Sequence, residues 1–347
     1  MIQSRHEHYL SLFPTEPAFR WKQIEQGLFS FASSWEDLTA LSKYMRENIG
    51  SIPWMSVTEQ QIQVSRNSDT HKALLRVEGD KDIETVLMRN KREAWTICVS
   101  SQIGCAMRCG FCATGKMGLI RNLTTDEIVD QYRYWMQYLK DHPELEGRIS
   151  NIVFMGMGEP LANYEAVKDA LNLILKHTDI GRTRITVSTV GVLPRLEQIL
   201  TDKDWPHIRL AVSLHSAVAE TRKQIVPTSY DDFLPKLGDW AKRYLYRHGN
   251  RRHHLTFEYV MLKGVNDTPD QARALAKFVN RIGNVRVNLI PYNLTGLEFE
   301  CSTNPTIKAF LDVLQSKHVI ATTRRTMGDD IDAACGQLAV KEKTSDT

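Results

Sequence analysis

The stretch Cys105-Ala-Met-Arg-Cys109-Gly-Phe-Cys112 decides how this chain of 347 residues is interpreted, because its three cysteines have the spacing C-x3-C-x2-C. A cubane iron–sulfur cluster contains four irons, so three cysteine thiolates leave one iron open to a small molecule. A structural zinc site normally takes four ligands in two pairs, and no second C-x2-C occurs in the sequence. The motif therefore favours an iron–sulfur loop with an open iron over a zinc site or buried free thiols.

The composition is that of a globular protein. The chain is 42% hydrophobic and carries 44 basic and 41 acidic residues, a net charge of +3. A nearly balanced charge neither requires nor excludes a nucleic-acid partner. The first residues contain no apolar signal segment, and no stretch approaches the length of a membrane span. We therefore expect a cytoplasmic protein without a membrane partner, whose six cysteines stay reduced.

Residues 1–70 are expected to form a helical accessory domain. Apolar side chains recur at helical spacing between Phe19 and Phe31 and again between Leu38 and Met45. The same region carries several basic side chains, which motivates the hypothesis that it contacts a nucleic acid. These residues are Arg20, Lys22, Lys43 and Arg46.

Residues 71–95 are predicted to be a β-hairpin extension. Apolar and polar residues alternate in Leu75-Arg76-Val77-Glu78, the pair Gly79-Asp80 is a turn signal, and a second strand pattern follows from Ile83 to Met88. A further strand at residues 95–100 leads directly into the cysteine loop. The hairpin is thus expected beside the first strand of the main domain.

Residues 96–325 alternate between strand and helix patterns. Helices are predicted at residues 124–140, which open on the capping box Thr124-Thr125-Asp126-Glu127, and at 269–282. Such alternation implies a parallel sheet with right-handed crossovers. We therefore predict an α/β fold, a partial (β/α)6 barrel with its site at the strand C-terminal ends. The predicted strands are residues 95–100, 151–155, 184–189, 209–214, 254–262, 285–290 and 319–324.

Small and polar residues follow several of these strands. A glycine-rich turn is usually only a turn, and an isolated histidine such as His215 is more often structural than catalytic. Their coincidence at one face of one barrel, beside the cysteine loop, predicts a cofactor cleft. The runs are Gly156-Met157-Gly158-Glu159-Pro160, Ser188-Thr189-Val190-Gly191, Ser213-Leu214-His215-Ser216 and Pro291-Tyr292-Asn293.

Together, the motifs resemble the RlmN/Cfr family of radical S-adenosylmethionine (SAM) RNA adenosine methyltransferases. The resemblance extends from about residue 15 to 340, and the C-terminal decapeptide is its most specific part. The matching runs are Ile83-Glu84-Thr85-Val86, Cys98-Val99-Ser100-Ser101-Gln102-Ile103-Gly104-Cys105, Arg121-Asn122-Leu123, Phe154-Met155-Gly156-Met157-Gly158-Glu159-Pro160, Ser213-Leu214-His215, Gly264-Val265-Asn266-Asp267 and Asp329-Asp330-Ile331-Asp332-Ala333-Ala334-Cys335-Gly336-Gln337-Leu338.

The resemblance implies a role for each matching position. Cys105, Cys109 and Cys112 would hold a [4Fe-4S] cluster, and residues 326–347 would form a loop that carries the methyl-accepting Cys335. Cys98 would be its partner thiol and Glu84 a proton acceptor. SAM would be surrounded by Gly158, Glu159, Ser188, Ser213, Leu214, His215 and Asn293.

The family mechanism uses two SAM molecules per turnover, because C2 and C8 of adenine are not nucleophilic. Cys335 takes a methyl group from the first SAM, which requires a thiolate. Reductive cleavage of the second SAM yields a radical that removes hydrogen from this methyl, and the carbon then adds to the base. After Glu84 or Cys98 takes the ring proton, Cys98 attacks the Cys335 sulfur, so that a disulfide forms and the methylated base is released.

RlmN enzymes methylate C2 of an adenosine in the peptidyl transferase loop of 23S rRNA and, in some bacteria, the purine beside the tRNA anticodon. Cfr enzymes methylate C8 of the same rRNA adenosine and confer antibiotic resistance. Pro160 fits the RlmN pattern better, so C2 is favoured. The resemblance further implies a flavodoxin- or ferredoxin-type electron donor, and nothing in it requires a dimer. The alternative from another class is a non-catalytic, metal-stabilised RNA-binding module.

Overall fold

A sheet of ten strands organises the computed structural model, which describes residues 2–90, 92–249 and 255–340. The strand order is β1-β2-β3-β4-β7-β8-β9-β10-β11-β12, and every pairing from β4 to β12 is parallel. The parallel strands are β4 (Trp95–Cys98), β7 (Ile149–Phe154), β8 (Ile185–Thr189), β9 (Arg209–Ser213), β10 (Leu255–Met261), β11 (Val285–Pro291) and β12 (Ile320–Thr323). All seven correspond to predicted strands, although residue 254 of the predicted fifth strand lies outside the described residues.

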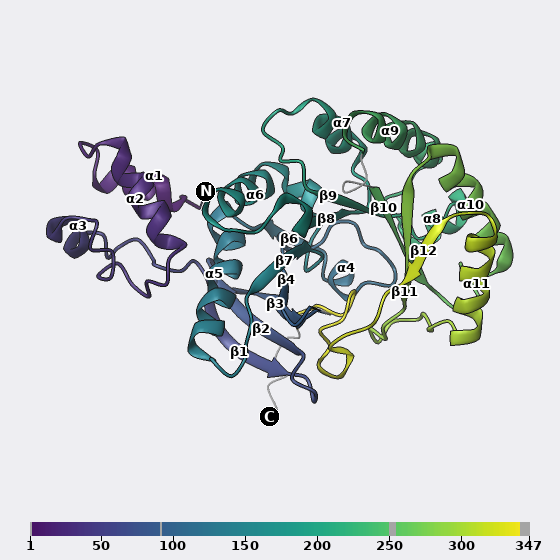
Figure 1. Cartoon of the computed structure of the whole chain (residues 1–347), viewed down its shortest axis with the longest axis horizontal. Coiled ribbons are helices and arrows are strands. Elements are labelled where there is room, and N and C mark those ends of the chain that lie inside the picture. Colours follow the sequence, from purple (N-terminus) through teal and green to yellow (C-terminus); the bar gives the residue numbers. More distant parts are fainter. Residues whose placement is uncertain (1, 91, 250–254, 341–347) are drawn as a thin grey trace.

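Helices cover the outer face of this sheet (Figure 1). Six β/α units followed by β12 make a partial barrel, which confirms the predicted fold class. Each unit contributes one of the main helices. These are α5 (Thr125–Asp141), α6 (Tyr164–His177), α7 (Leu193–Thr201), α9 (Phe233–His248), α10 (Pro269–Ile282) and α11 (Asn304–Ser316).

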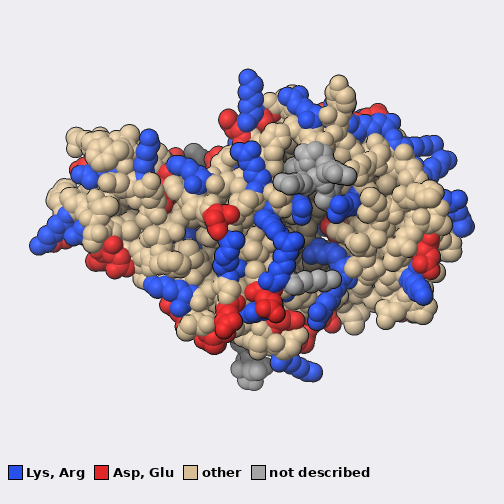
Figure 2. Space-filling view, in the orientation of Figure 1, with Lys and Arg blue, Asp and Glu red and all other residues tan. Residues whose placement is uncertain are grey.

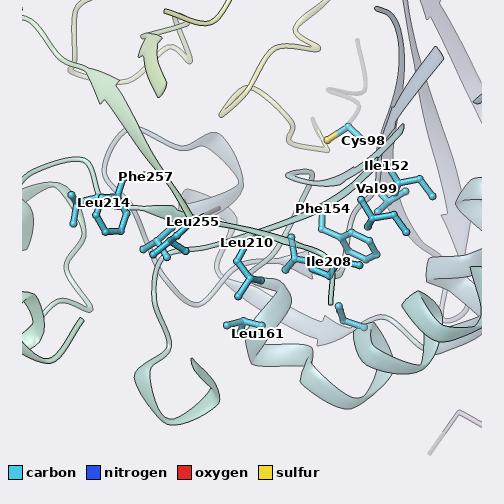
Figure 3. Packing of buried hydrophobic residues seen from close by; sticks show 14 of the residues in the cluster. Cys98, Val99, Ile152, Phe154, Leu161, Ile208, Leu210, Leu214, Leu255 and Phe257 are labelled. Atoms are coloured by element: carbon cyan, nitrogen blue, oxygen red, sulfur yellow. The ribbon is translucent and has the colours of Figure 1, made fainter. Parts of the chain in front are cut away.

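The strands divide their side chains between an apolar outer face and a polar lumen. Ile152, Leu210 and Phe257 point outward and belong to the buried core under the helices, as Figure 3 shows. On the same strands, Ser213 and Glu258 point into a cavity within the barrel. Because successive side chains alternate between the two faces of a strand, the buried outer residues determine which polar residues face the lumen.

An antiparallel extension continues the sheet beyond β4. The predicted hairpin is present as β2 (Thr70–Val77) and β3 (Lys81–Arg89), and its turn residues Gly79 and Asp80 both have positive φ. Strand β1 (Thr58–Val64) was not predicted and lies inside the range assigned to a helical domain. It is a mostly exposed edge strand with the sequence TEQQIQV, so it lacks the apolar alternation that marks a half-buried strand.

Three short helices form a separate N-terminal unit at one side of the barrel (Figure 1): α1 (Arg5–Leu12), α2 (Ala18–Leu28) and α3 (Lys43–Asn48). They have their own apolar core. A buried ion pair attaches this unit to helix α5: the Arg5 guanidinium lies 2.5 Å from Asp130, which also pairs with Arg133 of the same helix at 2.5 Å. Removing one partner of a buried pair is strongly destabilising, so the unit is firmly anchored.

The C-terminal segment, residues 326–340, returns to the barrel and includes the short helix η3 (Asp329–Ile331). Figure 1 shows it in yellow near β3 and α4 (Ala113–Met117). The Ala113 N–H donates to the Gly336 carbonyl at 2.8 Å, at the start of α4. Residues 341–347 of the predicted segment lie outside the described residues. No helix in the described part of the chain is long and apolar enough to cross a membrane.

Candidate active site

A cavity opens at the C-terminal ends of the parallel strands. It encloses about 880 Å³ when its open mouth is included. The structure therefore brings together residues that lie far apart in the sequence. The predicted residues lining it are Cys105, Cys109, Cys112, Gly158, Glu159, Ser188, Ser213, His215, Asn293 and Cys335.

The three cysteines of the motif lie between β5 (Gln102–Gly104) and α4. Backbone bonds fix their loop: Cys105 N–H donates to the Gly118 carbonyl and Gly110 N–H to the Ile225 carbonyl, both at 2.9 Å. Burial raises the pKa of the Cys105 thiol to about 12. A buried thiol of this kind ionises when a positive group lies nearby. Burial also raises the pKa of the Cys109 thiol, and the charge of the buried Arg222 opposes that increase.

These cysteines fit a cluster better than a single metal ion. All three line the same open cavity, and theirs are the only side chains of their loop there that can ionise to thiolates. Among the described residues, no three His, Cys, Asp or Glu side chains are placed to hold one metal ion. A set of thiols around open space is the donor chemistry that an iron–sulfur cluster requires.

Glycines allow the loop after β7 to lie against the strand that precedes the cysteines. Gly158 has φ +100°, and a Cβ added there would lie 2.6 Å from the Gln102 Cβ. A Cβ on Gly156 would lie 2.7 Å from the Ser100 Oγ. The side chain of Gln102 accepts the Glu159 N–H at 2.7 Å, so the turn is bound to this strand.

Glu159 connects the ends of two neighbouring strands. One carboxylate oxygen accepts the Leu161 N–H at 2.9 Å and the other accepts the Val190 N–H at 2.8 Å. Burial raises the pKa of this carboxyl group. The Thr189 side chain also bonds this carboxylate. A carboxylate has about four acceptor positions, so the predicted contact with an amine stays compatible with the geometry.

We predict that Gly158→Ala destabilises the fold and weakens SAM binding at least about tenfold, because backbone strain and a clash with Gln102 displace the turn. The matched control is Gly283→Ala, where φ is +122° but nothing lies within 4 Å of the added Cβ. The control should lose about 1–3 kcal/mol of unfolding free energy and keep its SAM affinity. Equal SAM affinity in both variants, measured by equilibrium dialysis of reconstituted protein, would contradict the assignment.

His215 is held in one orientation and one protonation state. Its Nδ1 accepts the Val260 N–H at 3.1 Å, so the proton of the neutral ring is on Nε2. Burial lowers the pKa of His215 to about 3. The buried Asn266 donates to the carbonyls of His215 and Val260, both at 2.7 Å. The ring thus offers a fixed N–H donor, and Asn266 of the Gly-Val-Asn-Asp motif holds the backbone at His215 and Val260.

The remaining predicted SAM residues differ in how they meet the cavity. The hydroxyl groups of Ser188 and Ser213 lie 3.3 Å apart on its wall. Leu214 is fully buried and packs with the outer core near Phe257, as Figure 3 shows, so its side chain does not line the cavity. The Asn293 amide donates to the Cys335 carbonyl at 3.0 Å and thereby holds the C-terminal segment.

Cys335 is exposed and lies at the boundary of two cavities. It lines the cavity of the three cysteines and a second cavity that is also lined by Cys98. Burial raises the pKa of the Cys98 thiol to about 12. All six cysteines are free, so the predicted disulfide is not formed in this structure. Cys335 therefore borders both the cavity of the three cysteines and the cavity of Cys98.

Glu84 lies behind the C-terminal segment and lines neither of these cavities. Its carboxylate lies 2.9 Å from the Lys72 ammonium and accepts the Ala339 N–H at 2.8 Å. Burial raises the pKa of this carboxyl group although Lys72 opposes the rise. Glu84 and Lys72 thus fix the segment that carries Cys335.

Two charged residues of the cavity were not predicted, Glu258 and Arg324. Glu258 is buried in the middle of a strand, and Arg324 follows the last strand. An inward-facing charge within an apolar strand run, as in Phe257-Glu258-Tyr259-Val260, is the signal that could have identified Glu258.

The fold and the three-cysteine cavity define a radical SAM enzyme. The sequence profile of the Radical SAM superfamily matches residues 99–279, about half of the chain. A crystal structure of a radical SAM methyltransferase from Sphaerobacter thermophilus superposes with a TM-score of 0.87, at 34% identity and 97% coverage of both chains. Enzymes of this class use a [4Fe-4S] cluster and SAM.

More particularly, the chain belongs to the RlmN family of RNA methyltransferases. It is 36% identical over 345 residues to the dual-specificity RNA methyltransferase RlmN of Xanthomonas campestris pv. campestris strain 8004, which covers 96% of this chain and 85% of the relative. The protein of the same name from strain B100 matches equally well. Membership of this enzyme family confirms the catalytic interpretation and leaves the non-catalytic module without support.

Proposed function

We propose that the chain methylates C2 of an adenosine in the peptidyl transferase loop of 23S rRNA, and the purine beside the anticodon of tRNA. Cys105, Cys109 and Cys112 would hold the cluster. When bound, the cluster supplies the electron that cleaves SAM to a 5′-deoxyadenosyl radical. The observation that carries the proposal is the position of Cys335 between the cluster cavity and the cavity of Cys98. The relatives named dual-specificity RNA methyltransferase support it.

The residues around the cavity suit the parts of SAM. Glu159 and His215 offer a carboxylate acceptor and a fixed N–H donor, which match an amino and a carboxylate group. Ser188 and Ser213 offer hydroxyls on the neighbouring strands β8 and β9. Gly158 contributes close backbone approach, and Asn293 contributes an amide shared with the Cys335 loop.

In the proposed reaction, Cys335 accepts the methyl group and Cys98 resolves the bond between Cys335 and the base. Cys98 and Cys335 line the same cavity, whereas the Glu84 carboxylate contacts Lys72 and the Ala339 backbone. Direct proton transfer to Glu84 would require the C-terminal segment to move. This geometry supports Cys98 over Glu84 as the acceptor of the ring proton, which Cys98 then passes to solvent before its thiolate attacks the Cys335 sulfur.

The regiochemistry is tested by the product. A 23S rRNA fragment and a tRNA are incubated anaerobically with reconstituted protein, SAM and reductant, and their nucleosides are separated by mass spectrometry. We expect 2-methyladenosine from both RNAs. Formation of 8-methyladenosine would assign the chain to the Cfr branch, and unmodified RNA despite SAM cleavage would contradict an RNA substrate.

RNA recognition is proposed to use the basic surface and the helical N-terminal unit. Figure 2 shows Lys and Arg side chains gathered around a hollow in the middle of one face. Within the unit, Arg46 donates to the Leu41 carbonyl at 2.7 Å, whereas Lys43 is exposed near Glu47. Lys22 and Lys43 are therefore better placed than Arg46 to contact phosphates.

We further propose a cytoplasmic monomer that receives electrons from a flavodoxin- or ferredoxin-type protein. The relatives are named RNA methyltransferases, and an RNA substrate supports the proposed cytoplasmic location. Size-exclusion chromatography with light scattering tests the oligomeric state.

A further inference from the structure

A row of polar residues crosses the lumen in register: Ser213 on β9, Glu258 on β10, Asn288 on β11 and Thr322 on β12. The Thr322 hydroxyl donates to the Asn288 Oδ1 at 2.9 Å, so the Asn288 Nδ2 faces Glu258. This amide nitrogen donates to the Glu258 Oε1 at 3.0 Å. One carboxylate oxygen of Glu258 is thus held by a defined chain of donors.

The other oxygen of Glu258 has an unused acceptor position. Oε2 is buried, and no hydrogen-bond partner for it exists among the described residues. The nearest charged group is the Arg324 guanidinium, whose Nη1 lies 3.8 Å away, beyond hydrogen-bond distance. A buried polar atom without a partner is costly, so a ligand that donates a hydrogen bond here would be strongly favoured.

Glu258 and Arg324 both line the cavity, and Oε2 and the guanidinium make an acceptor and a donor 3.8 Å apart there. Adenine presents the complementary edge, because its amino group donates next to ring nitrogens that accept. A 6-oxo purine would place an oxygen against the carboxylate, which is repulsive. The pair is therefore suited to select a 6-amino purine.

We propose that Glu258 accepts a hydrogen bond from the 6-amino group of the target adenine, while Arg324 donates to a neighbouring ring nitrogen. This inference rests on the proposed function and adds to it the residues that recognise the base. SAM also carries an adenine, but Arg324 and Cys335 both line the two cavities. A base held by Arg324 lies where its carbon can meet the methyl group on Cys335, which favours the RNA base.

Glu258→Gln is the sharpest test, because it preserves shape and reverses the chemistry. Asn288 continues to donate to the side-chain oxygen, so the glutamine presents its NH₂ group to the cavity. A donor then faces the 6-amino group. Thr322→Val is a second, milder variant on the exposed edge strand, since it frees the Asn288 amide to turn.

The measurement compares two RNA hairpins that differ only in the target base, adenine or purine without the 6-amino group. For each protein, competition binding gives the ratio of the affinities for the two RNAs, and single-turnover methylation gives the ratio of their reaction rates. The wild type should prefer adenine at least about tenfold, as expected for a hydrogen bond to a charged group. Glu258→Gln should lose or reverse this preference, and Thr322→Val should reduce it. Glu300→Gln, an exposed carboxylate paired with Lys263, is the matched control.

A SAM titration without RNA distinguishes the two adenines. The SAM affinity of reconstituted Glu258→Gln should equal that of the wild type. A tenfold loss of SAM affinity with an unchanged base preference would overturn the proposal, as would wild-type preference in the variant. Failure of the proposed function is distinguishable, because the wild type itself would then methylate neither RNA.

Discussion

Replacing Cys335 with alanine is expected to reduce RNA methylation by at least about a thousandfold, as for other nucleophiles on which both half-reactions depend. Cys335 is the exposed cysteine at the boundary of the two cavities, and its carbonyl is fixed by the Asn293 amide. No other cysteine lines both. The loss is measured as methylated adenosine formed per enzyme under anaerobic conditions.

The same variant should keep the cysteine loop intact. The bonds that fix this loop come from Gly118 and Ile225 and do not involve the Cys335 sulfur. Iron and sulfide content, and reductive cleavage of SAM, should therefore match the wild type. Cys301→Ala is the matched control, because Cys301 lines neither cavity. Methylation that survives in Cys335→Ala would remove Cys335 from the reaction.

The barrel was predictable because its strands are buried on at least one face. Buried parallel strands contain apolar runs, as in Ile152-Val153-Phe154 of β7, and the helices between them begin with recognisable caps. Thr124 and Glu127 make the predicted capping box. Strand β1 escaped prediction because its partner β2 stabilises it through backbone bonds, while its own side chains are mostly polar and exposed.

The site was predictable where it depends on short motifs and not where it depends on register. The cysteine spacing and the Gly-Met-Gly-Glu-Pro turn carry their chemistry locally. Glu258 lies in the cavity wall because the register of β9, β10 and β11 aligns it between Ser213 and Asn288. The contact of Glu84 with the Ala339 N–H spans 255 residues. Such pairings follow from the folded sheet, and no local pattern encodes them.

Replacing Cys98 with alanine is expected to trap a covalent protein–RNA adduct. In the proposed reaction the Cys98 thiolate attacks the Cys335 sulfur, which forms the disulfide and releases the methylated base. Both cysteines line one cavity, and none of the other cysteines does. Without Cys98, the base should stay bonded through the methylene carbon to Cys335. The variant should therefore release no free methylated RNA.

The adduct is detected as a species of reduced mobility on a denaturing gel. Digestion with ribonuclease and then with a protease should convert it to a peptide with a nucleoside-modified Cys335. Burial raises the pKa of the Cys98 thiol to about 12. Its thiolate fraction therefore grows as the pH rises towards that value, so release by the wild type should accelerate with pH while the Cys98→Ala adduct should not respond. Cys301→Ala should release product like the wild type. Free methylated RNA from Cys98→Ala in catalytic amounts would show that another group resolves the intermediate.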